Sequence, residues 1–223
     1  MSRVLLAAAL AAALAGPAVA RPVVVEMFVS QSCSSCPPAD ALLQRLSTAP
    51  GILPLSFNVT YWNDLGWRDT DSLQAATDRQ NWYAGLFGSG QVYTPQAVVD
   101  GKAQVVGSDE AGLRAAIATA QAAQGPAVAV SIGGQQALTL TVGAGKGSGR
   151  VLLVGFDALH STPVGGGENS DRVITEVNVV RQLTDLGAWQ GQALTLHTPA
   201  PAGQHVAVLL QAADGIVLGL ATR

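Results

Sequence analysis

Cys33-Ser34-Ser35-Cys36 follows the apolar run Val23-Val24-Val25-Glu26-Met27-Phe28-Val29 and precedes Pro37-Pro38. Its two cysteines are the only ones in the chain. A C-x-x-C motif between a predicted strand and a predicted helix is typical of a redox pair. One helical turn brings the two sulfur atoms close enough to bridge, and the free N–H groups at the helix N-terminus stabilise a thiolate at the first cysteine. We therefore expect Cys33 to be an exposed nucleophile and Cys36 a more sheltered resolving thiol.

Two other interpretations of the cysteine pair remain open. One is a structural disulfide in a non-catalytic secreted module. The other is a metal-handling protein that binds Cu(I) or Zn(II) through Cys33 and Cys36, since thiolates suit these ions, with His160 as a further ligand. A closed tetrahedral site normally has four ligands, and the chain has three histidines, none close to the cysteines in sequence. The reduction potential separates a catalytic disulfide from a structural one, because structural disulfides typically lie below roughly −300 mV and catalytic ones above it.

The first 20 residues have the pattern of a secretory signal peptide. Arg3 is the single early charge, Leu and Ala make up most of residues 4–14, and Ala18-Val19-Ala20 supplies small residues at a cleavage point. The apolar segment is shorter than a membrane span. We expect cleavage after Ala20 and a periplasmic or secreted protein, in a compartment where disulfides persist.

The composition excludes several classes of partner. The formal net charge is −3 and no basic run occurs, so the electrostatic footprint of a nucleic-acid-binding protein is missing. No other apolar stretch approaches the roughly 18 residues that indicate a membrane span. With 48% hydrophobic and 12% charged residues, the chain has the material for a substantial core.

Residues 21–125 predict an α/β domain. The continuous apolar run 23–29 is typical of a strand buried on both faces of a parallel or mixed sheet. Apolar residues recur at helical spacing over 39–46, which places Asp40 on the opposite face. Pro37-Pro38 suits the first turn of this helix, where N–H groups have no partner. The other predicted elements are a strand over 52–60, a helix over about 72–87 and a last helix that ends at Gly125-Pro126.

Thr94-Pro95 leads a predicted hairpin. Two apolar strands within residues 96–107 are joined by Asp100-Gly101, a strong signal for a two-residue turn. A proline at the head of a strand that pairs inside a sheet is explained by a cis peptide bond. We therefore predict that the Thr94–Pro95 bond is cis.

Residues 126–223 predict a small β-sandwich-like domain. No helical period of comparable length occurs there, and glycine-rich turns separate the apolar runs. The predicted strands are 128–132, 138–142, 151–156, 173–180, 194–196, 206–211 and 216–221. The expected organisation is therefore a signal peptide over 1–20, an α/β domain over 21–125 and an all-β domain over 126–223.

One predicted strand in this second half carries a polar face. Arg172, Glu176 and Asn178 share one side of the strand, and His160, Glu168 and Asn169 lie just upstream. A solvated face with surface ion pairs would contribute only about 0–1 kcal/mol per pair. The alternative hypothesis is that this cluster docks on the cysteine-bearing half or contacts its partner.

The order of elements resembles the thioredoxin superfamily. The cysteine pair matches the family's redox pair, Pro95 its cis-proline, and Thr94 the residue before that proline. The resemblance implies a thioredoxin-like fold for residues 21–125, with Glu26 as counterpart of the buried carboxylate that assists proton transfer.

A finer resemblance is to a secreted bacterial family catalogued as domain of unknown function 1223. It covers essentially the whole chain after residue 20 and implies a fold without an established activity. The matching segments are 25–40 around the cysteines, Tyr61-Trp62, Leu65-Gly66-Trp67, Arg79-Gln80, Tyr83, Tyr93-Thr94-Pro95-Gln96, Gly167-Glu168-Asn169 and Asn178-Val179-Val180-Arg181.

The leading prediction is an exported thiol–disulfide oxidoreductase or redox partner. Cys33 attacks a disulfide, a mixed disulfide forms, and Cys36 resolves it. Thr94, Pro95 and Glu26 complete the predicted site. The expected partner is a protein or small-molecule thiol or disulfide, and no flavin or nicotinamide cofactor is implied.

Overall fold

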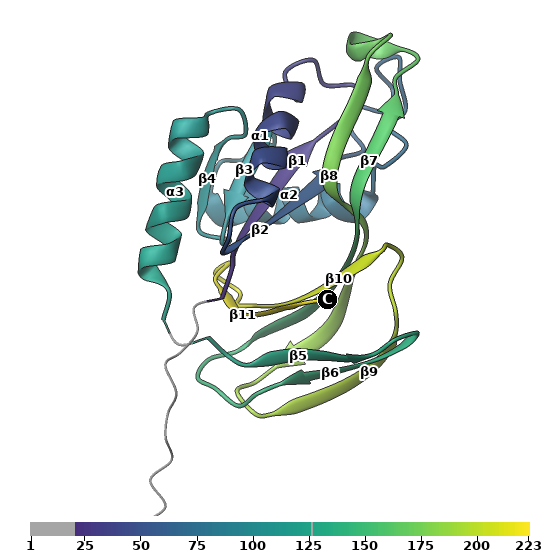
Figure 1. Cartoon of the computed structure of the whole chain (residues 1–223). Helices are drawn as coiled ribbons and strands as arrows, with labels where there is room; N and C mark the ends of the chain where they lie inside the picture. The colour runs from purple at the N-terminus through teal and green to yellow at the C-terminus, as the bar shows by residue number, and fades with distance from the viewer. Residues whose placement is uncertain (1–20, 126) are drawn as a thin grey trace, which may run out of the picture.

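The computed structural model of the chain describes residues 21–125 and 127–223 (Figure 1). The predicted signal peptide and Pro126 of the predicted domain boundary lie outside these residues. Within them the fold is mixed α/β, with one large mixed sheet, a smaller antiparallel sheet and three α-helices.

The large sheet has eight strands and the small sheet three. In spatial order the large sheet contains β11 (Val217–Thr222), β10 (His205–Gln211), β7 (Gly149–Pro163), β8 (Val173–Trp189), β2 (Ile52–Asn58), β1 (Val23–Val29), β3 (Gln96–Val99) and β4 (Ala103–Val106). The small sheet contains β5 (Val130–Gly134), β6 (Ala137–Val142) and β9 (Leu194–Pro199). The helices are α1 (Pro37–Ser47), α2 (Gln74–Phe87) and α3 (Glu110–Ala123).

Strand β1 lies in the middle of the cysteine-bearing half. It pairs in parallel with β2 and antiparallel with β3, and all seven of its residues are buried. The predicted strand buried on both faces of a mixed sheet is therefore confirmed. Because side chains alternate along a strand, Val25, Met27 and Val29 pack with α1, whereas Val24 and Phe28 pack with Tyr83 of α2 on the other face.

Helix α1 begins immediately after the cysteine pair. Cys36 is its N-cap residue, and the two prolines occupy its first positions, where a missing N–H costs nothing. Its apolar side chains at 39, 42, 43 and 46 are buried as predicted. Asp40 is buried too, at 5% exposure. The prediction that Asp40 lies on an outward face is wrong, because α1 also packs against β8, a strand more than 100 residues away in sequence.

The large sheet continues from one half of the chain into the other. β8 pairs in parallel with β2 through Ser56 and Val179, so strands from residues 21–125 and from residues 127–223 belong to the same sheet. The second half otherwise consists of strands and one 3₁₀ turn, η1 (Gly167–Asn169). The small sheet packs on this half of the large sheet through a separate apolar cluster that includes Leu140, Leu153 and Trp189.

Strands β7 and β8 form a hairpin much longer than predicted. Their pairing runs from Gly149 and Trp189 to Pro163 and Val173. Figure 1 shows the hairpin extending from the lower part of the molecule, past β2 and α1, to its upper end. The residues that join the two strands, 164–172, are called the hairpin tip below.

No helix within residues 21–125 or 127–223 has the length and apolar character needed to cross a membrane.

Candidate functional site

Cys33 and Cys36 form a disulfide at the N-terminus of α1. Their Cα atoms are 5.4 Å apart, and the Cys36 N–H donates to the Cys33 carbonyl at 3.1 Å, which closes the turn between them. The side chains of Ser34 and Ser35 are exposed. The motif therefore presents its central residues to solvent and its sulfur atoms to the protein.

The prediction that Cys33 is exposed is wrong for this disulfide form. Both cysteines are 0% exposed and belong to the apolar cluster between β1 and α1. Cys33 is covered in part because the hairpin tip lies against the segment that contains it. The sequence raises this contact only as one of two hypotheses for the polar cluster, since the tip is more than 130 residues away in the chain.

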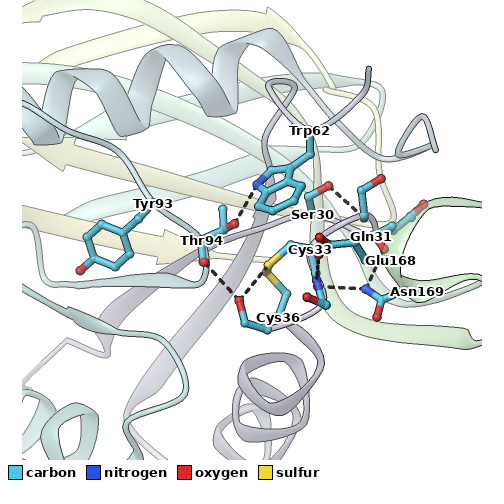
Figure 2. Close-up of a disulfide and its surroundings, with 12 residues drawn as sticks. Ser30, Gln31, Cys33, Cys36, Trp62, Tyr93, Thr94, Glu168 and Asn169 are labelled. Atoms are coloured by element: carbon cyan, nitrogen blue, oxygen red, sulfur yellow. Dashed lines mark hydrogen bonds between the residues drawn. A yellow bond between two sulfur atoms is a disulfide. The ribbon is translucent and has the colours of Figure 1, made fainter. Parts of the chain in front are cut away.

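Two residues of the hairpin tip contact the cysteine segment directly. Asn169, which is 1% exposed, donates from Nδ2 to the carbonyl oxygens of Gln31 at 3.0 Å and Cys33 at 2.9 Å. The neighbouring Glu168 accepts a hydrogen bond from the backbone N–H of Ser34 at 3.1 Å. Figure 2 shows both side chains on one side of the disulfide. The hypothesis that the polar cluster docks on the cysteine-bearing half is confirmed for these contacts.

Glycines allow the hairpin tip to approach this closely. A Cβ added to Gly166 would lie 2.4 Å from the carbonyl oxygen of Gly66, and one added to Gly167 would lie 3.2 Å from Cβ of Trp67. Trp67 itself donates from Nε1 to the side chain of Gln31 at 3.1 Å. The tip thus packs backbone to backbone on the loop after β2, and that loop supports the cysteine segment.

Thr94 lies on the other side of the disulfide. The Thr94–Pro95 peptide bond is cis, as predicted. Trp62 donates from Nε1 to Thr94 Oγ1 at 2.9 Å. Ser35 Oγ is 3.3 Å from Cys33 Sγ and 3.5 Å from the carbonyl oxygen of Thr94. The structure therefore brings Thr94 beside the cysteine pair (Figure 2).

Glu26 does not lie at this site. Its carboxylate forms a buried ion pair with Arg79 and accepts a hydrogen bond from the Tyr83 hydroxyl at 2.6 Å. Both partners belong to α2, which covers the face of the sheet opposite to α1. The alternation of side chains along β1 explains this placement, since Met27 faces α1 and its neighbour Glu26 must face the other way.

Buried carboxyl groups that the sequence analysis did not predict lie behind α1. Asp40, Asp69, Asp71 and Glu176 are all at most 5% exposed. Burial, with the nearby charges of Glu176 and Asp69, raises the pKa of Asp40 well above its usual value. Burial and the charge of Asp69 raise the pKa of Glu176 to about 8. Glu176 is therefore largely protonated in neutral solution, and Asp40 binds its proton more strongly than an exposed aspartate.

Hydrogen bonds connect this acidic cluster to the cysteine segment. Glu176 accepts from Ser56 Oγ at 3.2 Å and from Asn58 Nδ2 at 2.8 Å. Asn58 also donates to Asp69 at 3.0 Å, and Asp69 accepts from the backbone N–H of Gln31 at 2.8 Å. Two residues before Cys33, the chain is thus tied to β2 and β8. Gln31, Asp69 and Asp71 stand in polar stretches of the sequence, so the local pattern gave no signal that they would be buried together.

His160 contacts the acidic cluster instead of the cysteines. Its Nδ1 lies 2.5 Å from Asp71 Oδ2, and Arg181 pairs with the other oxygen of the same carboxylate. Arg172 is exposed and donates to Asn169 Oδ1 at 3.3 Å. In the part of the chain that the structure describes, no group of three or more His, Cys, Asp or Glu side chains is placed to hold a metal ion.

Comparisons with known proteins extend over nearly the whole chain. A family model described as "Protein of unknown function (DUF1223)" matches residues 24–211. A crystal structure of a protein from Agrobacterium tumefaciens is 31% identical, with a TM-score of 0.78, over 92% of this chain and 94% of that chain. The structure of HBP35 of Porphyromonas gingivalis has a similar fold at 13% identity, with a TM-score of 0.54, over 91% of this chain and 74% of that chain. No curated protein matches the sequence.

Proposed function

The chain belongs to the family described as protein of unknown function DUF1223, and from this premise we propose that it is a thiol–disulfide oxidoreductase of thioredoxin-like type. The observation that carries the proposal is the Cys33–Cys36 disulfide at the N-terminus of α1. Backbone N–H groups at that position favour a thiolate once the disulfide is reduced. The cis Thr94–Pro95 segment on the other side of the pair supports the same assignment.

The proposed reaction is a two-step exchange. The Cys33 thiolate attacks a substrate disulfide, forms a mixed disulfide and releases one substrate thiolate. Cys36 then attacks Cys33 Sγ, closes the protein disulfide and releases the second substrate thiolate. Two electrons pass from the dithiol to the substrate, and the protons of the two cysteines pass to the released thiols. The reverse sequence oxidises a substrate dithiol, and neither direction requires a flavin or nicotinamide.

The substrate is proposed to approach between Thr94 and the exposed serines of the motif. Ser34 and Ser35 face solvent there, and Trp62 and Tyr93 are partly exposed beside them. An extended thiol- or disulfide-bearing segment of a protein, or a small disulfide, would lie along the backbone before Pro95. We also propose that the protein is exported after cleavage at Ala20. Residues 21–125 are proposed to form the redox domain and residues 126–223 a second domain.

A structural disulfide is the second candidate, and the burial of both cysteines favours it. The reduction potential decides between the two. Equilibration of the protein with glutathione buffers of graded ratio, followed by trapping of free thiols, is expected to give a potential above roughly −300 mV. The reduced protein should also transfer electrons to a protein disulfide, and a Cys36→Ala variant should accumulate the mixed disulfide. A potential below that limit together with no transfer would establish a structural disulfide.

A further inference from the structure

The carboxylate of Glu168 contacts the backbone of the cysteine motif, immediately after Cys33. Its Oε2 accepts from the backbone N–H of Ser34, the first residue after Cys33, at 3.1 Å. That N–H belongs to the turn that leads into α1, at the positive end of the helix dipole. The N–H groups of Cys33 and Cys36 already donate to backbone carbonyls, so they are not free for an anion. A thiolate at Cys33 would draw its stabilisation from the same positive helix end.

The hairpin tip holds Glu168 at this position. The next residue, Asn169, is buried and fixed by its two hydrogen bonds to the cysteine segment. The preceding residue, Gly167, has a φ of +68°, which favours glycine, and a Cβ there would lie only 3.2 Å from Cβ of Trp67. Glu168 is itself exposed, but the backbone on either side of it is anchored. Its carboxylate is therefore delivered to Ser34 by the fold and not by a freely moving surface loop.

From this geometry we propose that Glu168 restrains the ionisation of the Cys33 thiol and thereby shifts the cysteine pair toward its disulfide form. This proposal rests on the proposed function. When the disulfide is reduced, the thiolate and the carboxylate lie at the same helix end, and the two negative charges there repel each other. A less stable thiolate means a less stable reduced form, so Glu168 makes the pair a stronger reductant. Glu168 is a positioning residue in this reaction because it acts through the backbone of Ser34.

Other charged and titratable groups face the cysteine segment from its neighbours, and none of them takes this place. Asp69, on the loop after β2, accepts a hydrogen bond from the backbone N–H of Gln31. Asp40 lies one helical turn after Cys36, and burial raises its pKa, which disfavours a charge there. From the hairpin tip, Arg172 donates to Asn169 and not to Glu168. Thr94 on the opposite side is uncharged.

Two variants test the effect of charge. Glu168→Gln keeps an oxygen acceptor for Ser34 and removes the charge, and Glu168→Lys reverses it. The fraction of Cys33 present as thiolate is read from its ultraviolet absorbance in the reduced full-length protein, with Cys36→Ala in the background so that one thiol is observed. At a pH below the thiol pKa, each step from wild type to Gln to Lys is expected to raise the thiolate fraction roughly two- to fivefold, the size expected for a charge at a helix end. In proteins with both cysteines, the reduction potential should rise in the same order.

Glu110→Gln provides the matched control. Glu110 is an exposed glutamate in the first turn of α3, bonded to Arg45 and Arg114, and its loss should leave the Cys33 thiolate fraction unchanged. Equal thiolate fractions in wild type, Glu168→Gln and Glu168→Lys would overturn the proposal. A change of the same size and sign in both variants would overturn it too, because it would indicate a structural effect independent of charge. Failure of the proposed function is a separate outcome: the wild-type protein would then exchange no disulfide with a substrate. The thiolate fraction is measured without any substrate, so it does not depend on that result.

Discussion

Asn169 and Cys33 are separated by 136 residues in the chain, yet Asn169 Nδ2 donates a 2.9 Å hydrogen bond to the Cys33 carbonyl oxygen. The contact joins the far end of the β7–β8 hairpin to the turn that carries the disulfide. The question is therefore whether the hairpin tip must move before a reagent can reach Cys33 Sγ. This relationship leads to the first two predictions.

Asn169→Ala should loosen the hairpin tip. The substitution removes both hydrogen bonds to the cysteine segment and is expected to lower the free energy of unfolding by about 1–3 kcal/mol. In the reduced protein, Cys33 should react faster with an alkylating reagent. Asn178→Ala is the matched control, since Asn178 of β8 also donates from Nδ2 to a carbonyl, that of Pro54, at 2.8 Å. It should lower stability without changing the alkylation of Cys33. An unchanged rate in Asn169→Ala would mean that the tip does not limit access.

Gly166→Ala should displace the hairpin tip sterically. Its Cβ would lie 2.4 Å from the carbonyl oxygen of Gly66, a backbone atom that cannot turn aside. We expect lower stability, by about 1–3 kcal/mol, and faster reduction of the disulfide by dithiothreitol. Gly85→Ala in α2 is the control, because nothing lies within 4 Å of its added Cβ. It should stabilise the protein by roughly 0.5–1 kcal/mol and leave reduction unchanged. Equal reduction rates in both variants would contradict the covering role of the tip.

The reduced cysteines should differ in reactivity. Cys33 lies beside the exposed serines and ahead of the helix N-terminus, whereas Cys36 is the N-cap residue and continues into the core. Alkylation across pH should show one fast thiol, with an apparent pKa below the value of about 8.5 of a free thiol. The fast reaction should disappear in Cys33→Ala and remain in Cys36→Ala. Two equally slow thiols would count against catalysis.

Glu176→Gln should change how stability depends on pH. The pKa of Glu176 is raised from 4.5 to about 8, so between these values the folded state binds a proton that the unfolded state has lost. The free energy of unfolding then falls as pH rises through this window, by about 1.4 kcal/mol per pH unit at most. The Gln variant should lose this slope and be more stable than wild type near pH 8. Denaturant midpoints from pH 4 to pH 8.5 measure it.

Glu110→Gln supplies the comparison for the pH series. Hydrogen bonds from Arg114 and Arg45 lower the pKa of Glu110. It is therefore ionised in both the folded and the unfolded state above pH 5, and its removal should leave the slope between pH 5 and 8 unchanged. A slope that persists in Glu176→Gln would assign the proton uptake to another group, with Asp40 the first to test.

Local sequence pattern predicted the elements around the cysteines well. The continuous apolar run of β1, the helical spacing in α1 and the Thr94-Pro95 signal each depend on neighbouring residues, and each prediction is confirmed. The burial of Cys33 and of Asp40 was not predicted. Both are covered by residues of the β7–β8 hairpin, and a contact made by residues so distant leaves no periodicity in either segment.

The acidic cluster is a second case in which local sequence pattern does not reveal a contact between distant segments. The sequence predicts Glu176 on the polar face of a strand and Asp40 on the polar face of a helix. Local pattern assigns polar residues to solvent, whereas here the two polar faces meet each other. Such an arrangement becomes visible only once the neighbour of β2 is known to be β8.

The pairing of β8 with β2 also determines what a shortened protein would be. A polypeptide that ended near residue 125 would retain both cysteines, α1 and cis-Pro95, and would look complete as a redox module. It would lack β8, the strand that pairs with β2. The backbone N–H and C=O groups of β2 would then be exposed at the edge of an apolar sheet. Exposed edges of this kind pair with other chains and lead to aggregation. The shortened polypeptide would also leave Asn58 and Ser56 without the carboxyl group of Glu176. The second half of the chain thus protects β2 of the first half from becoming an exposed, aggregation-prone edge strand.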